Sequence, residues 1–385
     1  MLQHLEPMTT VTCIEDLRRI AHSRVPRDFM DYFESGSYSE QTLRLNRDDL
    51  QRLLLQPRVL ADVAQRSQTT TMAGQSVSMP IALAPIGMSG MAYQDGEIHA
   101  CRAAEAAGIP YILSTMSICS IEDVAAAVSK PFWFQLYVMK DRGFVRELIQ
   151  RAIAAKCSAL VLTVDLQVLG QRHRDLKNGL SVPPELRLGT VLRIAARPRW
   201  ALGVLGGKRK TFGNIDGRIA GMDGVRSLSQ WTAQQFDQAL SWDDVDWVRG
   251  LWPGPLILKG IMDEDDARRA VTSGATALVV SNHGGRQLDG APSSISVLPR
   301  IADAVGSDIE VLFDGGIRSG QDVMRALALG ARGCLLGRAY VYGLCADGGA
   351  GVRRAIEIIR SELDVTMALT GVRTIAGIDR RVIVD

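Results

Sequence analysis

Eight short runs of apolar, β-prone residues recur along the chain, and most precede a segment with helical periodicity. Runs that are apolar on both faces are typical of parallel strands covered by helices. The predicted strands are Ile81–Pro85, Pro110–Ser114, Pro131–Tyr137, Ala159–Val164, Pro255–Lys259, Ala277–Ser281, Ile309–Phe313 and Gly333–Leu336. The predicted helices between them include Asp95–Ala107, Ile121–Val128, Asp141–Ala155, Asp263–Ser273 and Gln321–Leu329. Eight strand–helix alternations favour an α/β protein with a closed (β/α)8, or TIM, barrel.

The alternation is regular except between the fourth and fifth predicted strands, which lie about ninety residues apart. We assign residues 176–240 to an insertion in a barrel of residues 76–385. Residues 1–75 are expected to form a helical segment that packs on the barrel, with a polar linker over residues 65–78. A doubly wound nucleotide-binding sheet is not favoured, because no GxGxxG sequence follows an early strand.

The composition narrows the class of protein only slightly. Of 385 residues, 46% are hydrophobic and 22% charged, and the formal net charge of +2 does not indicate a nucleic-acid partner. The six cysteines form no CxxC pair or Cys/His cluster, so free thiols and no metal site are expected. No signal-peptide core or apolar run of about 18 residues occurs. We therefore expect a cytoplasmic protein, or one bound peripherally to the cytoplasmic side of the inner membrane.

Polar residues gather at the carboxyl ends of the predicted strands, where TIM barrels place their active sites. Burying such a set without a ligand would cost on the order of 1–3 kcal/mol for each unpaired group. Two turns there, FDGGIR (313–318) and LGR (336–338), combine glycine with arginine. Exposed backbone N–H groups and guanidinium charge are typical of the phosphate site of this fold. Tight turns that need a positive φ are the alternative interpretation.

His283 is the only one of five histidines predicted at a strand end, within SNHGGRQLDG (281–290). A neutral imidazole can accept a proton near pH 7, and an acid such as Asp165 would stabilise the resulting cation. His283 is therefore predicted to be a catalytic base.

Six motifs resemble those of the FMN-dependent 2-hydroxy acid dehydrogenases and oxidases. They are DYFESGS (31–37), WFQLYV (133–138), LTVD (162–165), LILKG (256–260), SNHGGRQLDG (281–290) and LFDGGIRSG (312–320). Within that family the chain most resembles the bacterial respiratory L-lactate dehydrogenases, through YSEQTLRLN (38–46), QLYVMKDRGF (135–144) and RHRDLKNG (172–179). The resemblance implies FMN as cofactor, oxidation of L-lactate to pyruvate, electron transfer to quinone or another respiratory carrier, and a homotetramer.

The resemblance also implies roles for the matching catalytic residues. His283 would take a proton from the substrate, and Asp165 would stabilise its protonated form. Arg172 and Arg286 would bind the substrate carboxylate, because a guanidinium fork matches its two oxygens. Tyr32 would donate to the same carboxylate, although packing of its helix on the barrel is the alternative.

Further residues would contact the substrate hydroxyl and the flavin. Tyr137 would bind the hydroxyl or ketone of the substrate, and Lys259 would lie at the flavin N1/O2 edge, where its charge stabilises the reduced ring. The isoalloxazine would contact Pro85, Ile86, Gly87, Ser114, Gln135 and Thr163. The ribityl phosphate would be held by Ser281, Asp314, Gly315, Gly316, Arg318, Gly337 and Arg338.

Two positions depart from the glycolate oxidases. Met116 replaces their tryptophan, so Met116 and Leu169 are expected to set the size of the substrate side chain. Gly87 replaces the usual alanine of the oxidases, as in members that pass electrons to a carrier rather than O2. The alternatives are a mandelate-type or another L-2-hydroxy acid dehydrogenase or oxidase, and an FMN-binding barrel without catalysis.

The insertion contains a basic and apolar stretch. Between Leu186 and Ile215 lie seven Lys or Arg residues and no acid, with several aliphatic residues and Trp200 among them. This pattern predicts a peripheral membrane contact with an interfacial tryptophan. A solvated flap over the active site is the alternative, and no nucleic-acid partner is expected.

Overall fold

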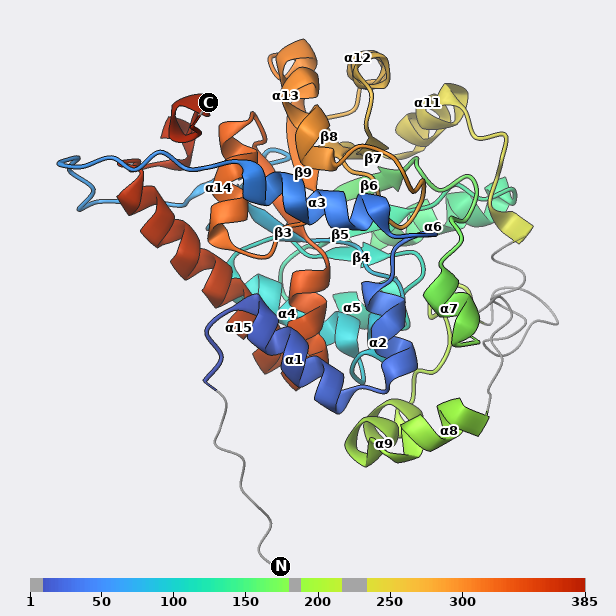
Figure 1. Cartoon of the computed structure of the whole chain (residues 1–385). Coiled ribbons are helices and arrows are strands. Elements are labelled where there is room, and N and C mark those ends of the chain that lie inside the picture. Colours follow the sequence, from blue (N-terminus) through green and yellow to red (C-terminus); the bar gives the residue numbers. More distant parts are fainter. Residues whose placement is uncertain (1–9, 180–187, 217–233, 385) are drawn as a thin grey trace, which may run out of the picture.

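The computed structural model describes residues 10–179, 188–216 and 234–384, and its centre is a barrel of eight parallel strands (Figure 1). The strands are β3 (Ile81–Leu83), β4 (Ile112–Ser114), β5 (Trp133–Leu136), β6 (Ala159–Thr163), β7 (Leu256–Ile261), β8 (Ala277–Val280), β9 (Glu310–Asp314) and β10 (Gly333–Leu336). Their order is β3-β10-β9-β8-β7-β6-β5-β4. A parallel bridge between Leu83 and Tyr111 joins β3 to β4 and closes the ring. The predicted (β/α)8 barrel is confirmed.

A helix follows each strand and covers the outside of the barrel (Figure 1). These helices are α4 (Gly96–Ala107), α5 (Ile121–Ala125), α6 (Arg142–Ala154), α11 (Trp242–Leu251), α12 (Glu264–Thr272), α13 (Ser294–Val305), α14 (Gly320–Ala328) and α15 (Arg338–Leu369). The strands are buried on both faces, which explains their continuous apolar runs. Non-helical backbone at Asp347 and Gly348 divides α15 into two parts.

A β-hairpin closes the amino-terminal end of the barrel. It consists of β1 (Thr70–Met72) and β2 (Gln75–Val77), and its buried side chains join the barrel interior. Gln75 accepts a hydrogen bond from the Trp133 indole (3.1 Å), and the Ala73 amide donates to Glu310 (2.8 Å). The polar linker predicted over residues 65–78 is therefore wrong in its second half. The hairpin crosses the boundary proposed at residue 75.

Three amino-terminal helices lie against the barrel and its outer helices (Figure 1). They are α1 (Ile14–Arg24), which packs on α15, α2 (Arg27–Glu34), and α3 (Gln41–Arg52), which contacts α13 and α14. These three helices lie within residues 14–52 of the segment predicted to be helical. Helix α2 matters most for the site, because it carries Tyr32 to the open end of the barrel.

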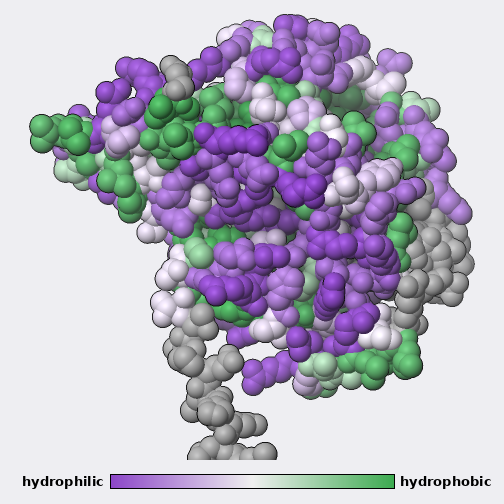
Figure 2. Space-filling model, in the orientation of Figure 1, coloured by the Kyte–Doolittle hydropathy of each residue, from purple (hydrophilic) through white to green (hydrophobic). Residues whose placement is uncertain are grey.

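Helix α7 (His173–Lys177) leads into the insertion, which contributes α8 (Leu188–Ala195) and α9 (Pro198–Gly206). Helices α8 and α9 project from the lower right of the molecule, where Figure 2 shows apolar surface. The predicted interfacial tryptophan is wrong, because Trp200 is buried against Phe29 of α2 (4.6 Å between ring centroids). The Trp200 indole also donates to the Met91 carbonyl (3.0 Å). None of the helices within the described residues combines the length and apolarity needed to cross a bilayer.

Candidate active site

His283 and Asp165 form a hydrogen-bonded pair at the carboxyl end of the barrel. The His283 Nδ1 and Asp165 Oδ1 atoms are 2.9 Å apart, although the residues are 118 positions apart in the sequence. Because Asp165 engages Nδ1, the other ring nitrogen, Nε2, is left to exchange a proton with a ligand. His283 has a left-handed backbone (φ 58°), which its amide supports by donating to Ser281 Oγ (3.1 Å).

The sequence interpretation missed Gly260, which lets Asp165 approach β7. Gly260 has φ 113°, and a Cβ atom there would lie 2.6 Å from Cβ and Cγ of Asp165. The signal in the sequence is a glycine directly after the strand-end Lys259, where a glycine often permits close backbone approach.

Lys259, Ser281 and Asp314 form a buried polar group beside the histidine. The Lys259 ammonium lies 2.9 Å from Ser281 Oγ and 3.0 Å from Asp314 Oδ2, and Ser281 donates to Asp314 (2.7 Å). Burial alone would lower the pKa of Lys259, but the Asp314 and Asp165 carboxylates raise it. Lys259 is therefore a fixed positive charge near the carboxyl ends of the strands.

Arg172, Arg286 and Tyr32 form a cationic cluster. Both guanidinium groups lie against the Tyr32 ring, 5.8 Å and 5.2 Å from its centroid. Burial and the nearby Arg172 charge lower the pKa of Arg286 to about 9. Two guanidinium groups held this close favour an anionic ligand such as a carboxylate.

Tyr137 is close enough to both parts of the site for Asp165, Arg172 and Arg286 to influence its pKa. Burial, followed by the negative charge of Asp165, raises the pKa of the Tyr137 hydroxyl above its ordinary value. The hydroxyl therefore stays protonated near neutral pH and can donate a hydrogen bond. The ring of Phe236, from the end of the insertion, packs edge-on against Tyr137 (5.7 Å).

The predicted flavin contacts lie on four neighbouring strands and their loops. Ser114 donates to Gln135 Oε1 (3.1 Å), whereas the buried Gln135 Nε2 has no hydrogen-bond partner among the described residues. Thr163 is buried at the end of β6.

Gly87, which follows Pro85 and Ile86, lies beside Met116 and Tyr32. A Cβ atom at Gly87 would be 3.3 Å from Met116 Cβ and 3.5 Å from the Tyr32 hydroxyl. Leu169 is half-buried in the loop after β6.

Only part of the predicted phosphate site is free to bind an anion. Gly315 and Gly316 have positive φ (129° and 85°), and Gly337 is the N-cap of α15. Arg318 lies over the Tyr342 ring (5.5 Å). By contrast, Arg338 donates to the carbonyls of Phe33, Ser35 and Gly284, each at 2.9 Å. Its guanidinium therefore ties α15 to the end of α2, and its role at a phosphate stays a prediction.

Asn46 of α3 is a second residue that the sequence interpretation missed. Asn46 and Asn282 exchange two side-chain hydrogen bonds of 2.8 Å, and the Ser294 amide donates to Asn46 Oδ1 (3.1 Å). This clamp holds the loop of His283 against the amino-terminal segment. Its sequence signal is an amide on the buried stripe of α3, which also contains Thr42 and Leu50.

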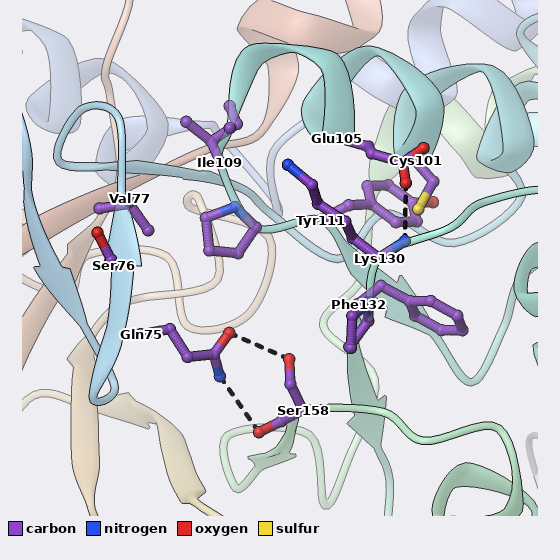
Figure 3. A pocket seen from close by; sticks show the side chains of 13 residues that line it. Gln75, Ser76, Val77, Cys101, Glu105, Ile109, Tyr111, Lys130, Phe132 and Ser158 are labelled. Carbon is purple, nitrogen blue, oxygen red and sulfur yellow. Dashed lines mark hydrogen bonds between the residues drawn. The ribbon is translucent and has the colours of Figure 1, made fainter.

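An open cavity of about 360 Å³ lies at the opposite end of the barrel, beside the β1–β2 hairpin (Figure 3). Gln75 and Ser158 hydrogen-bond to each other there. None of the predicted site residues lines this cavity. It is therefore separate from the candidate active site.

Comparison with known proteins identifies the family. Residues 21–385 match the family described as FMN-dependent dehydrogenase. The chain belongs to the FMN-dependent dehydrogenases. This confirms the predicted enzyme class and the predicted cofactor, FMN.

Individual members of the FMN-dependent dehydrogenases match over almost the entire chain. An L-lactate dehydrogenase of Caulobacter vibrioides is 47% identical over 377 residues, covering 97% of this chain and 98% of that protein. One of Azorhizobium caulinodans is 50% identical over 368 residues, with coverage of 95% and 96%. The crystal structure of the monotopic membrane protein (S)-mandelate dehydrogenase superimposes with a TM-score of 0.92 at 35% identity, covering 97% of this chain and 99% of that one.

The residues of this FMN-dependent dehydrogenase fit its cofactor. Among the described residues the two N–H donors of buried Gln135 have no partner and require an acceptor, and the ring carbonyls of a flavin are acceptors. Lys259 supplies a buried positive charge, and Gly315 and Gly316 supply backbone with a positive φ where a phosphate is expected.

Proposed function

We propose that the protein oxidises a small L-2-hydroxy acid, L-lactate, to the 2-oxo acid pyruvate. The observation that carries this proposal is the pairing of His283 with Asp165, together with two clustered arginines that can bind a carboxylate. A proton acceptor and a carboxylate site at the same end of a barrel suit an α-hydroxy acid, whose reacting carbon is bonded to the carboxyl group.

Each residue has a defined task in this proposal. Arg172, Arg286 and Tyr32 bind the carboxylate, and Tyr137 donates to the substrate oxygen. His283 Nε2 takes the proton that leaves the substrate, and Asp165 stabilises the imidazolium through Nδ1. FMN, when bound, accepts the two electrons. Gln135 and Lys259 would hold its ring system, and Gly315, Gly316 and Arg318 its phosphate.

L-lactate is the proposed substrate because relatives at 47–50% identity are named L-lactate dehydrogenases. A mandelate-type substrate is the second candidate, because the mandelate dehydrogenase has a TM-score of 0.92. Met116, Leu169 and Phe236 are the side chains that would limit the size of the substrate group. Single pocket residues discriminate by about 1–3 kcal/mol.

We also propose that the protein binds a membrane surface through the exposed apolar face of α8 and α9. That face consists of Leu188, Val191, Leu192, Leu202 and Leu205. Apolar side chains exposed together beside lysines and arginines suit an anionic lipid surface. The monotopic mandelate dehydrogenase supports this proposal, and quinone is the proposed acceptor. A homo-oligomer, such as a tetramer, is proposed by family resemblance.

The first experiment is an anaerobic spectrum of the purified protein, followed by separate additions of L-lactate, D-lactate, glycolate and L-mandelate. Rapid loss of flavin absorbance with L-lactate alone would support the proposal. Loss with L-mandelate alone would replace L-lactate by an aromatic substrate. A flavin that none of the four acids reduces would contradict the proposed oxidation. Reoxidation of the reduced protein by a soluble quinone, compared with O2, then tests the acceptor.

A further inference from the structure

Arg172 is held at only one edge of its guanidinium group. Its Nε donates to Asp175 Oδ2 (2.6 Å), and within the part of the chain that the structure describes its two terminal nitrogens make no hydrogen bond. Asp175 lies three residues further on, in α7, and is buried. Its other oxygen, Oδ1, accepts from Ser35 Oγ (2.9 Å), so both carboxylate oxygens are used.

Ser35 connects Asp175 to the second arginine of the site. The Ser35 carbonyl accepts from Arg286 (2.8 Å) and Arg338 (2.9 Å), while its hydroxyl donates to Asp175. Ser35 is completely buried at the end of α2. One carboxylate therefore fixes Arg172 directly and reaches Arg286 through a single serine.

We propose that Asp175 is the positioning residue of the carboxylate site, holding Arg172 so that its two terminal nitrogens face the ligand and balancing the charge of the arginine cluster. The inference rests on the proposed function, because it assumes that Arg172 and Arg286 bind the substrate carboxylate. A guanidinium held through Nε keeps the pair of donors that matches two carboxylate oxygens.

The charges around Arg286 give Asp175 a second effect. Burial, Arg172 and Arg338 lower the pKa of Arg286 to about 9, whereas Asp175 and Tyr32 act in the opposite direction. Carboxylate binding needs protonated Arg286, so it is expected below that pKa and is lost as the pH rises through it. Removing the negative charge of Asp175 should move this loss to a lower pH.

A matched control distinguishes the proposed positioning role of Asp175 from a merely structural role. Asp31 of α2 is also buried and also joins α2 to the α7 region, by accepting from Arg174 (3.2 Å) and Asn178 (2.8 Å). The bonds of Asp31 do not include Arg172. Asp175→Asn and Asp31→Asn therefore make the same chemical change at two neighbouring contacts, of which only one holds the proposed ligand arginine.

The test uses the FMN-loaded full chain and oxalate, a carboxylate that the reaction cannot oxidise. For both variants we measure the Kd of oxalate from the flavin spectrum at several pH values between 6 and 10. We also measure kcat and KM for L-lactate. For Asp175→Asn we expect the Kd of oxalate and the KM for L-lactate to rise ~10-fold or more, whereas kcat should change less than ~3-fold. The pH above which oxalate binding is lost should be lower than in the wild type. For Asp31→Asn we expect wild-type values of Kd, KM and pH dependence.

Equal changes in the two variants, or an unaltered Kd in Asp175→Asn, would overturn the inference. If Asp175→Asn does not fold, Ser35→Ala replaces it, since this variant keeps the charge but frees one carboxylate oxygen. The Kd of oxalate for Ser35→Ala should then rise ~2- to 5-fold, and the pH at which binding is lost should not change. An unchanged Kd would also overturn the inference. A wild-type protein that binds no oxalate and is reduced by no hydroxy acid would instead contradict the proposed function itself.

Discussion

The backbone of His283 is in the left-handed region, and Gly284 and Gly285 follow with φ of 64° and 73°. For a non-glycine residue this conformation costs on the order of 1 kcal/mol, and the surrounding contacts must compensate for it. The Ser281 hydroxyl and the Asn46–Asn282 clamp supply those contacts. Strain at a single strand-end histidine agrees with its proposed role as base.

Replacing His283 with glutamine should remove the proton acceptor without removing the cofactor. We expect kcat for L-lactate to fall by about 10²–10⁴-fold, because glutamine cannot take a proton. The visible flavin spectrum should stay that of an FMN-loaded protein. Steady-state kinetics and the ratio of flavin to protein absorbance measure both effects. Retained turnover would show that another group is the base.

Gly260→Ala should displace Asp165, because the added Cβ would overlap it. We expect a loss of ~1–3 kcal/mol of unfolding free energy and a lower kcat. Gly274→Ala is the matched control, since Gly274 also has a positive φ (74°) but no atom closer than 3.8 Å to an added Cβ. The control should lose about 1 kcal/mol and keep its kcat. The explanation would be wrong if both variants kept full activity.

At the scale of elements, α2 is the connection between the insertion and the site. It carries Tyr32, its last carbonyls accept from Arg286 and Arg338, and its outer side binds the insertion. Trp200 packs on Phe29, and Arg193 donates to the fully buried Asp28 (2.9 Å). Helices α8 and α9 are thus fixed to a helix of the active site.

Trp200→Ala should release α9 from α2. Loss of a buried indole and its hydrogen bond typically costs ~3–5 kcal/mol, so α8 and α9 should become sensitive to limited proteolysis. Leu202→Ala, two residues away and 79% exposed, is expected to change stability by less than ~0.5 kcal/mol. Identical proteolysis of the two variants would contradict the anchoring role of Trp200.

At the scale of the whole molecule, exposed apolar residues are concentrated at two separate places. One is the face of α8 and α9, and the other is the loop after α3, where Val59 and Leu60 are 85% and 104% exposed. Figures 1 and 2 show these regions at the lower right and the upper left of the molecule. Only the first belongs to the basic insertion, so only the first is the proposed membrane contact.

Changing Leu188, Leu202 and Leu205 together to serine should weaken binding to phosphatidylglycerol–phosphatidylcholine vesicles by at least ~10-fold. Reduction of the flavin by L-lactate should be unaffected, because these side chains lie outside the site. The control changes Val59 and Leu60 to serine and should bind vesicles like the wild type. Co-sedimentation with the vesicles at low and high salt measures the binding of both variants. Full binding by the triple variant would contradict the proposed contact.

The apolar pattern by itself determined the barrel, because a parallel strand covered on both faces must be apolar throughout. It also determined which residues stand at strand ends, and therefore that His283, Lys259 and Asp314 share one face. Family motifs then indicated FMN before any geometry was known. These conclusions need only local periodicity and the rule that TIM barrels bind ligands at their carboxyl ends.

Only the tertiary structure decided which remote side chains meet. The Asp165–His283 contact spans 118 residues, and the link from Asp175 to Ser35 spans 140. The burial of Trp200, the hairpin at the barrel floor and the carbonyl contacts of Arg338 were likewise invisible in the pattern. Each depends on a neighbour that packing supplies, and hydrophobic periodicity records that a face is buried but not what buries it.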